Sequence, residues 1–285
     1  MTPDTGSLES RLNAAYELHQ AGELGEAESR YQALLNEAPD IPEIHFLLGV
    51  LLHQSGRTGA ARPHLELAAP QLETAQAWHA LADCQRHAGD PQAASSSYRR
   101  LLALNSTDMA ARRALAQCLE QAGDLGGALA EYAGAYRARL SEDGPELPEL
   151  VRFMRRLTPT RHDDGLAMLG VELIDHPAVT PATLFPPMIA LLRQAPEVTK
   201  ALSALAAGQD IARQVFSQLQ RNRLLLALMR NGLLADPHLE GLLIHMRRRC
   251  LADPDAATAE FLMALATQCF LNEYLYPVNQ DDLDR

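Results

Sequence analysis

The chain has 285 residues, of which 47% are hydrophobic and 21% are charged, a composition that is typical of globular proteins and excludes a largely disordered one. Its net charge of −11 argues against nucleic acid and anionic membrane surfaces as partners, because both attract cationic surfaces. No apolar stretch approaches the ~20 residues that cross a bilayer, and the N-terminal residues lack the pattern of a signal peptide, which favours a cytoplasmic location.

The first half of the chain repeats with a period close to 34 residues. Glycines that are 34, 33 and 34 residues apart stand at Gly22, Gly56, Gly89 and Gly123. An alanine follows each glycine after five residues, and a tyrosine or leucine comes four residues later. A glycine can take positive φ where a helix ends, and a small side chain lets two helices cross closely. The pattern predicts four stacked helical pairs at 8–41, 42–74, 75–108 and 109–142.

These repeats resemble a known family. The stretches AGELGEAESRYQALLNEAPD and HAGDPQAASSSYRRLLALN are similar to tetratricopeptide repeats. The resemblance implies an all-α superhelix whose concave face, made by the first helix of each repeat, binds an extended peptide or a partner protein. The positions that the family uses on this face fall on Leu12, Tyr16, His19, Gln20, Phe46, Val50, His53, Gln54, His79, Asp83, Arg86, His87, Arg113 and Gln117, with Glu120 and Gln121 at the end of the fourth repeat.

Two His-Gln pairs occupy equivalent positions in the first two repeats, at 19–20 and 53–54. They are expected to form a ladder along one surface, where their side chains could donate and accept hydrogen bonds along a peptide backbone. Tyr16, Phe46 and Val50 would supply apolar contact. The alternative is that these positions are ordinary solvated residues on a helix face.

Other partners of this face are disfavoured. His19, His53 and His87 lie about one repeat apart, which argues against their converging on one metal ion. The face also carries no lysine, whereas the tetratricopeptide grooves that clamp the carboxylate of a chaperone tail depend on lysines and asparagines. A protein or peptide of another kind is the expected partner.

The second half, residues 143–285, is predicted to be all-α without a repeat. Helices are expected near 146–157, 163–175, 181–194, 196–207, 210–231, 237–251 and 256–274. The stretch RHDD at 161–164 could suggest metal or acid–base chemistry, but its place before a helix favours Asp163 or Asp164 as a capping residue. Since no phosphate loop, GxSxG or HExxH occurs, neither a catalytic residue nor a cofactor is expected within these residues.

A second resemblance covers roughly residues 220–282. Some bacterial proteins join tetratricopeptide repeats to an S-adenosylmethionine-dependent methyltransferase, with a helical segment ahead of the catalytic domain. Two stretches of this chain resemble that segment, namely RNRLLLALMRNGLLADPHLEGLLIHMRRRCL and EFLMALATQCFLNEYLYPVNQDD. The resemblance implies a substrate-recruiting N-terminal portion of a longer enzyme. S-adenosylmethionine would bind downstream, since no residue for it can be placed on this chain.

Two alternatives stay open beside the methyltransferase. One is a free-standing scaffold that assembles a complex, and the other is the repeat portion of a glycosyl- or sulfotransferase. The exposed ends of a repeat array also allow oligomers.

The last predicted helix, 256–274, is expected to pack through Phe261, Leu265, Phe270 and Tyr274. If Phe270 is buried, replacing it with alanine would lower the free energy of unfolding by about 3–5 kcal/mol. Deleting 277–285 is expected to leave thermal stability nearly unchanged.

Overall fold

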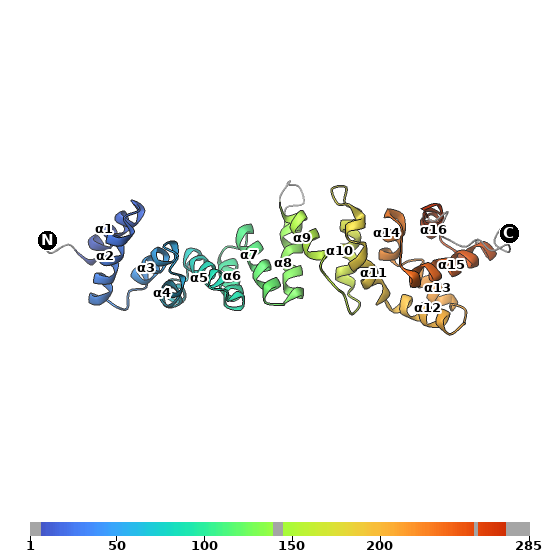
Figure 1. Cartoon of the computed structure of the whole chain (residues 1–285), viewed down its shortest axis with the longest axis horizontal. Helices are drawn as coiled ribbons and strands as arrows, with labels where there is room; N and C mark the ends of the chain where they lie inside the picture. The colour runs from blue at the N-terminus through green and yellow to red at the C-terminus, as the bar shows by residue number, and fades with distance from the viewer. Residues whose placement is uncertain (1–6, 139–144, 254–255, 272–285) are drawn as a thin grey trace. The chain divides into compact units, whose positions relative to one another are not determined.

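A computed structural model describes residues 7–138, 145–253 and 256–271 (Figure 1). These ranges hold 16 α-helices and one short 3-10 helix and contain no strand, so the all-α prediction is confirmed. Among these helices, none is long and apolar enough to cross a membrane. The chain divides into two compact units, Met1–Glu146 and Leu147–Arg285.

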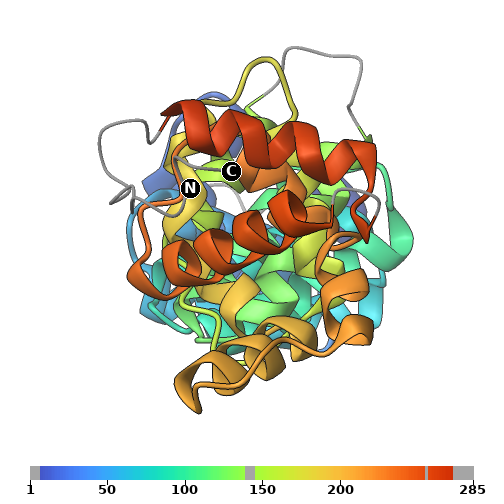
Figure 2. The ribbon, with the colours of Figure 1, turned by 90° about the vertical axis from the view of Figure 1, so that its right-hand side faces the viewer.

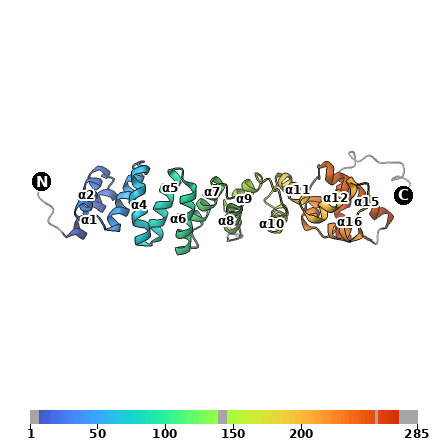
Figure 3. The ribbon, with the colours of Figure 1, turned by 90° about the horizontal axis from the view of Figure 1, so that it is seen from below.

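The first unit consists of four helical pairs in chain order (Figure 3). The pairs are α1 (Leu8–Gln20) with α2 (Leu24–Glu37), α3 (Pro42–Gln54) with α4 (Thr58–Leu72), α5 (Ala75–His87) with α6 (Pro91–Leu104), and α7 (Met109–Gln121) with α8 (Leu125–Ala138). The second helix of each pair contacts the first helix of the next. Each pair falls within one predicted repeat, which confirms the repeat structure.

The repeated glycines end the first helix of each pair. Gly22, Gly56, Gly89 and Gly123 have φ between 76° and 82°, a left-handed conformation that side chains disfavour. After each glycine, the next backbone N–H returns to a carbonyl in the last helical turn; in the first repeat, Glu23 N donates to Leu18 O at 3.0 Å. This is the Schellman arrangement. The regular spacing of the glycines therefore marks the C-terminal end of the first helix in each repeat.

The repeated alanines and large residues form the core between paired helices. Ala27, Ala61, Ala94 and Ala128 are all fully buried, and the tyrosine or leucine four residues later is buried as well. Packing is so close that a Cβ added to Gly49 would lie 2.7 Å from Leu65 Cγ. A small residue on one helix and a large one on its neighbour therefore set the distance between the two helices.

The second unit also packs helices on helices but without a repeat. Its helices are α9 (Glu146–Met154), α10 (Asp164–Ile174), α11 (Phe185–Arg193), α12 (Pro196–Ala206), α13 (Arg213–Leu219), α14 (Arg223–Asn231), α15 (Pro237–Ala252) and α16 (Ala259–Leu271), with the 3-10 helix Pro181–Thr183 before α11. Helix α14 contacts α10, α11 and α16, and six of its nine residues are buried. Figure 2 shows α15 and α16 side by side.

The single helix predicted over 210–231 is wrong, because the chain turns between α13 and α14. Asn222 ends the turn by accepting a hydrogen bond from Leu225 N at 2.8 Å, so it acts as the N-cap of α14. The buried side chain of Gln220 bonds the backbone before α16, with Nε2 donating to Ala256 O at 3.0 Å and Oε1 accepting from Thr258 N at 2.7 Å. The break is fixed by a segment that lies far away in sequence.

The predicted packing of the last helix is partly wrong. Phe261 and Leu265 are buried as expected, whereas Phe270 is 76% exposed and Tyr274 lies outside the described residues. Phe270 follows Phe261 by nine residues, about two and a half turns, which places it on the opposite face of α16. The stability cost expected for Phe270→Ala required a buried side chain, and that condition is not met.

Candidate functional site

The first helices of three consecutive repeats line a hollow of about 610 Å³. This volume is within the range of about 300–1,000 Å³ that is usual for ligand sites. The lining residues come from α1, α3 and α5 and are Tyr16, His19, Gln20, Phe46, Leu47, Val50, Gln54, Gln76 and Ala80. Six of the predicted groove residues therefore come together here, although what they bind stays a prediction.

The wall of the hollow on α3 is apolar. Phe46, Leu47 and Val50 are half-buried and pack against the core of the first repeats, which limits their movement. Tyr16 stands on α1 with 42% of its surface exposed. The hollow therefore combines a fixed apolar wall with an accessible aromatic side chain.

Polar side chains connect the first two repeats across the hollow. His19 Nε2 lies 2.9 Å from Gln54 Oε1, and Gln20 Nε2 donates to the Tyr16 hydroxyl at 2.5 Å. The Tyr31 hydroxyl lies 3.5 Å from His19 Nδ1, and burial with the neighbouring Tyr16 raises the pKa of Tyr31 to about 12. The phenol therefore stays protonated and can donate to Nδ1, which leaves His19 Nε2–H to donate to Gln54.

The groove positions of the third repeat form a separate charged cluster. Asp83 Oδ1 accepts from Tyr98 Oη at 2.5 Å and from an Arg86 nitrogen at 3.2 Å, and Asp83 Oδ2 lies 3.5 Å from His79 Nδ1. Burial opposes ionisation of Asp83, but Tyr98, His79 and Arg86 outweigh it and hold the pKa of the carboxyl below its ordinary value. The carboxylate is thus charged and already paired within its own repeat.

Two of the repeated histidines lie in contact. The His53 and His87 rings have centroids 5.1 Å apart, and His87 Nδ1 lies 2.8 Å from Asp83 O. Burial, together with His87 and Arg86, lowers the pKa of His53, although Asp83 acts in the opposite direction. In the part of the chain that the structure describes, no group of three or more His, Cys, Asp or Glu residues could hold a metal ion.

The remaining predicted positions lie outside the hollow, on α1, α3, α5 and α7. Leu12 packs against the core, while Arg113 and Gln117 are half-buried on α7. Sequence reasoning missed Leu47, Gln76 and Ala80. The helical spacing of Gln76, Ala80 and Asp83 was a signal that could have found two of them.

A further histidine pair, which sequence reasoning also missed, joins the two helices of the second repeat. His45 Nδ1 and His64 Nδ1 are 2.8 Å apart, and His45 Nε2 lies 2.7 Å from Pro39 O. Because a carbonyl only accepts, His45 Nε2 carries the proton, its Nδ1 accepts, and His64 Nδ1 donates. Burial and the neighbouring His45 hold the pKa of His64 below its ordinary value.

The first unit is expected to lose stability as the pH falls from 7.5 to 5.5. Both His53 and His64 have lowered pKa values in the folded chain, so below the ordinary histidine pKa of about 6.5 the unfolded chain binds more protons. Stability is therefore complete above that value and is lost on acidification. Urea unfolding followed by the fluorescence of Trp78, the only tryptophan, would measure this loss in the first unit.

His64→Asn should reduce this dependence on pH, whereas replacing the exposed His238 of the second unit should leave it unchanged. An equal loss on acidification in wild type and His64→Asn would contradict the role given to the pair.

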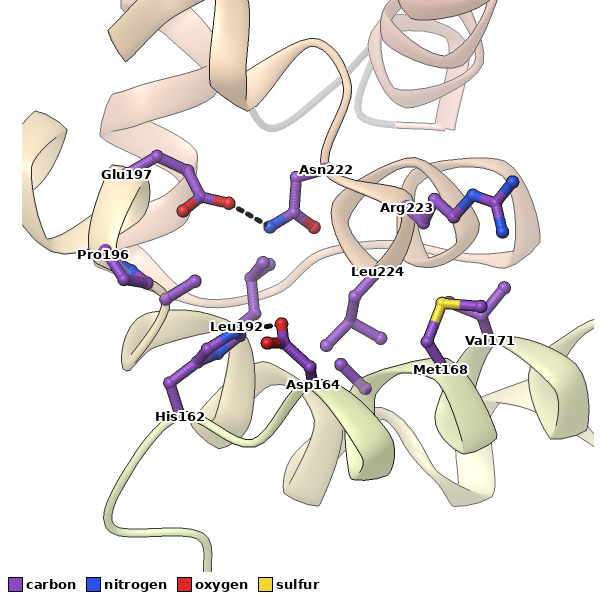
Figure 4. Close-up of a pocket in the computed structure, with 12 residues that line it drawn as sticks. His162, Asp164, Met168, Val171, Leu192, Pro196, Glu197, Asn222, Arg223 and Leu224 are labelled. Carbon is purple, nitrogen blue, oxygen red and sulfur yellow. Dashed lines mark hydrogen bonds and ion pairs between the residues drawn. The ribbon is translucent and has the colours of Figure 1, made fainter.

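The second unit holds a different pocket, of about 390 Å³, between α10, α12 and α14 (Figure 4). His162 Nε2 lies 2.9 Å from Asp164 Oδ1, and across the pocket Asn222 Nδ2 donates to Glu197 Oε1 at 2.6 Å. Asp163 caps α10 by accepting from Leu166 N at 2.8 Å, which confirms the capping prediction for this stretch. Asn222, which lines the pocket, caps α14, and the lining residues Asp164, Pro196 and Arg223 are the first residues of α10, α12 and α14.

Comparisons with known proteins support the repeats. A family described as "Tetratricopeptide repeat" matches residues 12–75 and 79–145, whereas no curated protein matches the chain significantly. Similar solved structures include YrrB, described as a TPR protein with an unusual peptide-binding site, which is 17% identical with a TM-score of 0.45 over 69% of this chain and 90% of that chain. MamA 41-end from Desulfovibrio magneticus RS-1 is 15% identical, with a TM-score of 0.44 over 50% of this chain and 80% of that one.

These structural likenesses are too weak to carry an argument about function. The family match instead agrees with the glycine period, the helical pairs and the buried alanines. Residues 12–75 and 79–145 of this chain are tetratricopeptide repeats.

Proposed function

We propose that this chain binds a protein through its repeats and recruits it as the substrate of an S-adenosylmethionine-dependent methyltransferase. The observation that carries the binding role is the hollow on α1, α3 and α5, which lies on the first helices of three successive repeats. Tetratricopeptide repeats use this face for protein partners, and six residues that line the hollow are positions that the family uses there. The net charge of −11 favours a protein over nucleic acid as the partner.

The methyltransferase role is supported by two sequence stretches within residues 220–282, which resemble the segment ahead of such catalytic domains. The described residues hold helices and turns only. The methyl donor would therefore bind on a downstream domain with a glycine-rich turn after its first strand. The chain's own contribution would be to hold the substrate protein near that domain.

The test uses the full product of the gene, incubated with tritium-labelled S-adenosylmethionine and cell extract. Labelled proteins should appear, and Tyr16→Glu should reduce the labelling, because it places a charge in the hollow. Leu67→Glu is a matched control, since Leu67 is 40% exposed but lies on α4, outside the hollow. Labelling that Tyr16→Glu leaves unchanged would contradict recruitment by the groove.

A free-standing scaffold is the second candidate, and one observation favours it. The stretch that suggests a methyltransferase contains three residues that are buried within the second unit, namely Phe261, Leu265 and Gln268. Packing alone could therefore explain these three residues. A stop codon directly after the codon for Arg285 would support the scaffold, and a downstream βαβ pattern would support the enzyme.

A further inference from the structure

The lining of the hollow carries no lysine, arginine, aspartate or glutamate. All nine residues are aromatic, aliphatic, amide or imidazole side chains, although 21% of the whole chain is charged. His19 has both ring nitrogens within hydrogen-bond distance of neutral groups, with Nε2 near Gln54 and Nδ1 near Tyr31. Its neutral form satisfies both contacts, since one nitrogen donates and the other accepts.

Each of the three helices contributes one glutamine to the hollow, namely Gln20, Gln54 and Gln76. Gln54 uses its Oε1 for His19, and as placed its Nε2 has no partner within the described part of the chain. No hydrogen bond joins the Gln76 side chain to another described residue. An amide can donate and accept at once, which suits the alternating N–H and C=O groups of an extended backbone.

Beside these amides stands the apolar wall of Phe46, Leu47 and Val50. These side chains are held by the core behind them, so they offer a preformed surface to an apolar side chain. Burying such a side chain on a fixed wall requires little ordering of the protein itself.

We propose that the hollow takes an extended protein segment whose central residues are uncharged and include one large apolar side chain. The glutamines would bond the main chain of the segment, and the α3 wall would hold its apolar side chain. This inference rests on the proposed protein-binding function and names the chemistry of the partner. A charged side chain placed there would lose water without meeting an opposite charge, which should weaken binding about tenfold or more.

The requirement for an uncharged segment applies to the first three repeats. On α5, Gln76 and Ala80 line the hollow, and the charged cluster around Asp83 begins within the next turn. Asp83 and Arg86 pair with each other, at 3.2 Å. The uncharged part of the groove is thus bounded on one side by charges that are already satisfied.

The test is a selection of random nine-residue peptides, displayed on phage, against the full chain. Selected peptides should lack Asp, Glu, Lys and Arg at several adjacent positions and carry Leu, Phe, Met or Trp among them. With Tyr16→Glu as the target, the same positions should accept Lys or Arg. With Leu67→Glu as the target, the selected sequences should match those of wild type.

Fluorescence anisotropy then measures the affinity of one selected peptide and of two versions of it. Replacing its apolar residue with Lys or with Glu should each weaken binding about tenfold or more. Selected peptides that are charged at these positions, or equal affinity for the three peptides, would overturn the inference while leaving protein binding intact. A selection that enriches no peptide would contradict the proposed function itself, and the inference would fall with it.

Discussion

Phe261→Ala is expected to lower the free energy of unfolding of the second unit by about 3–5 kcal/mol. Phe261 is fully buried on α16 and meets the Phe216 ring of α13 edge to face, with centroids 6.4 Å apart. The Arg249 guanidinium of α15 lies 4.5 Å from the centre of the same Phe216 ring. Removing the Phe261 ring would leave a cavity where three helices meet, because close-packed neighbours relax only in part.

Hydrogen exchange of peptides from α13 to α16, together with urea unfolding followed by far-UV circular dichroism, would measure this effect. Tryptophan fluorescence is unsuitable, since Trp78 lies in the first unit. Phe270→Ala is the matched control on the same helix, and it should change stability by less than about 0.5 kcal/mol because Phe270 is 76% exposed. A larger loss from Phe270→Ala than from Phe261→Ala would contradict the packing of α16.

Gln268→Leu is expected to cost about 3 kcal/mol or more, although it exchanges a polar residue for an apolar one of similar size. The Gln268 side chain is fully buried. Its Nε2 donates to Met229 O at 2.7 Å and to Gly232 O at 2.5 Å, and its Oε1 accepts from Leu234 N at 3.1 Å. Leucine would leave these three backbone groups without their partner, in a place that water reaches poorly.

The neighbouring Thr267→Ala serves as a control, because among the described residues the Thr267 hydroxyl bonds only the carbonyl of Met263, on its own exposed helix face. Gln268→Glu should also destabilise the unit, since a carboxylate oxygen would replace the amide that donates to two carbonyls. Exchange rates in α14 and in the turn after it would report both effects. Wild-type protection in Gln268→Leu would show that this side chain does not hold the turn.

The sequence by itself determined the first unit. Gly22 and its three equivalents require a backbone conformation that is local to each turn, and each buried alanine faces a helix only a few residues away in sequence. These glycine and alanine positions act within one repeat, and the same pattern occurs in all four repeats. The helical pairs, their order and the face that carries the hollow could therefore be predicted, as could Tyr16, Phe46 and Val50 as lining residues.

Only the tertiary structure decided the rest, because the deciding contacts join residues far apart in the chain. Apolar spacing continues through 210–231, yet the chain turns at Gln220, whose partners are Ala256 and Thr258. Spacing likewise could not tell which aromatic of α16 is buried, since Phe261 and Phe270 stand on opposite faces and α14 covers one of them. Periodicity finds a helix with an apolar face, but the neighbour that covers that face is a property of the packed chain.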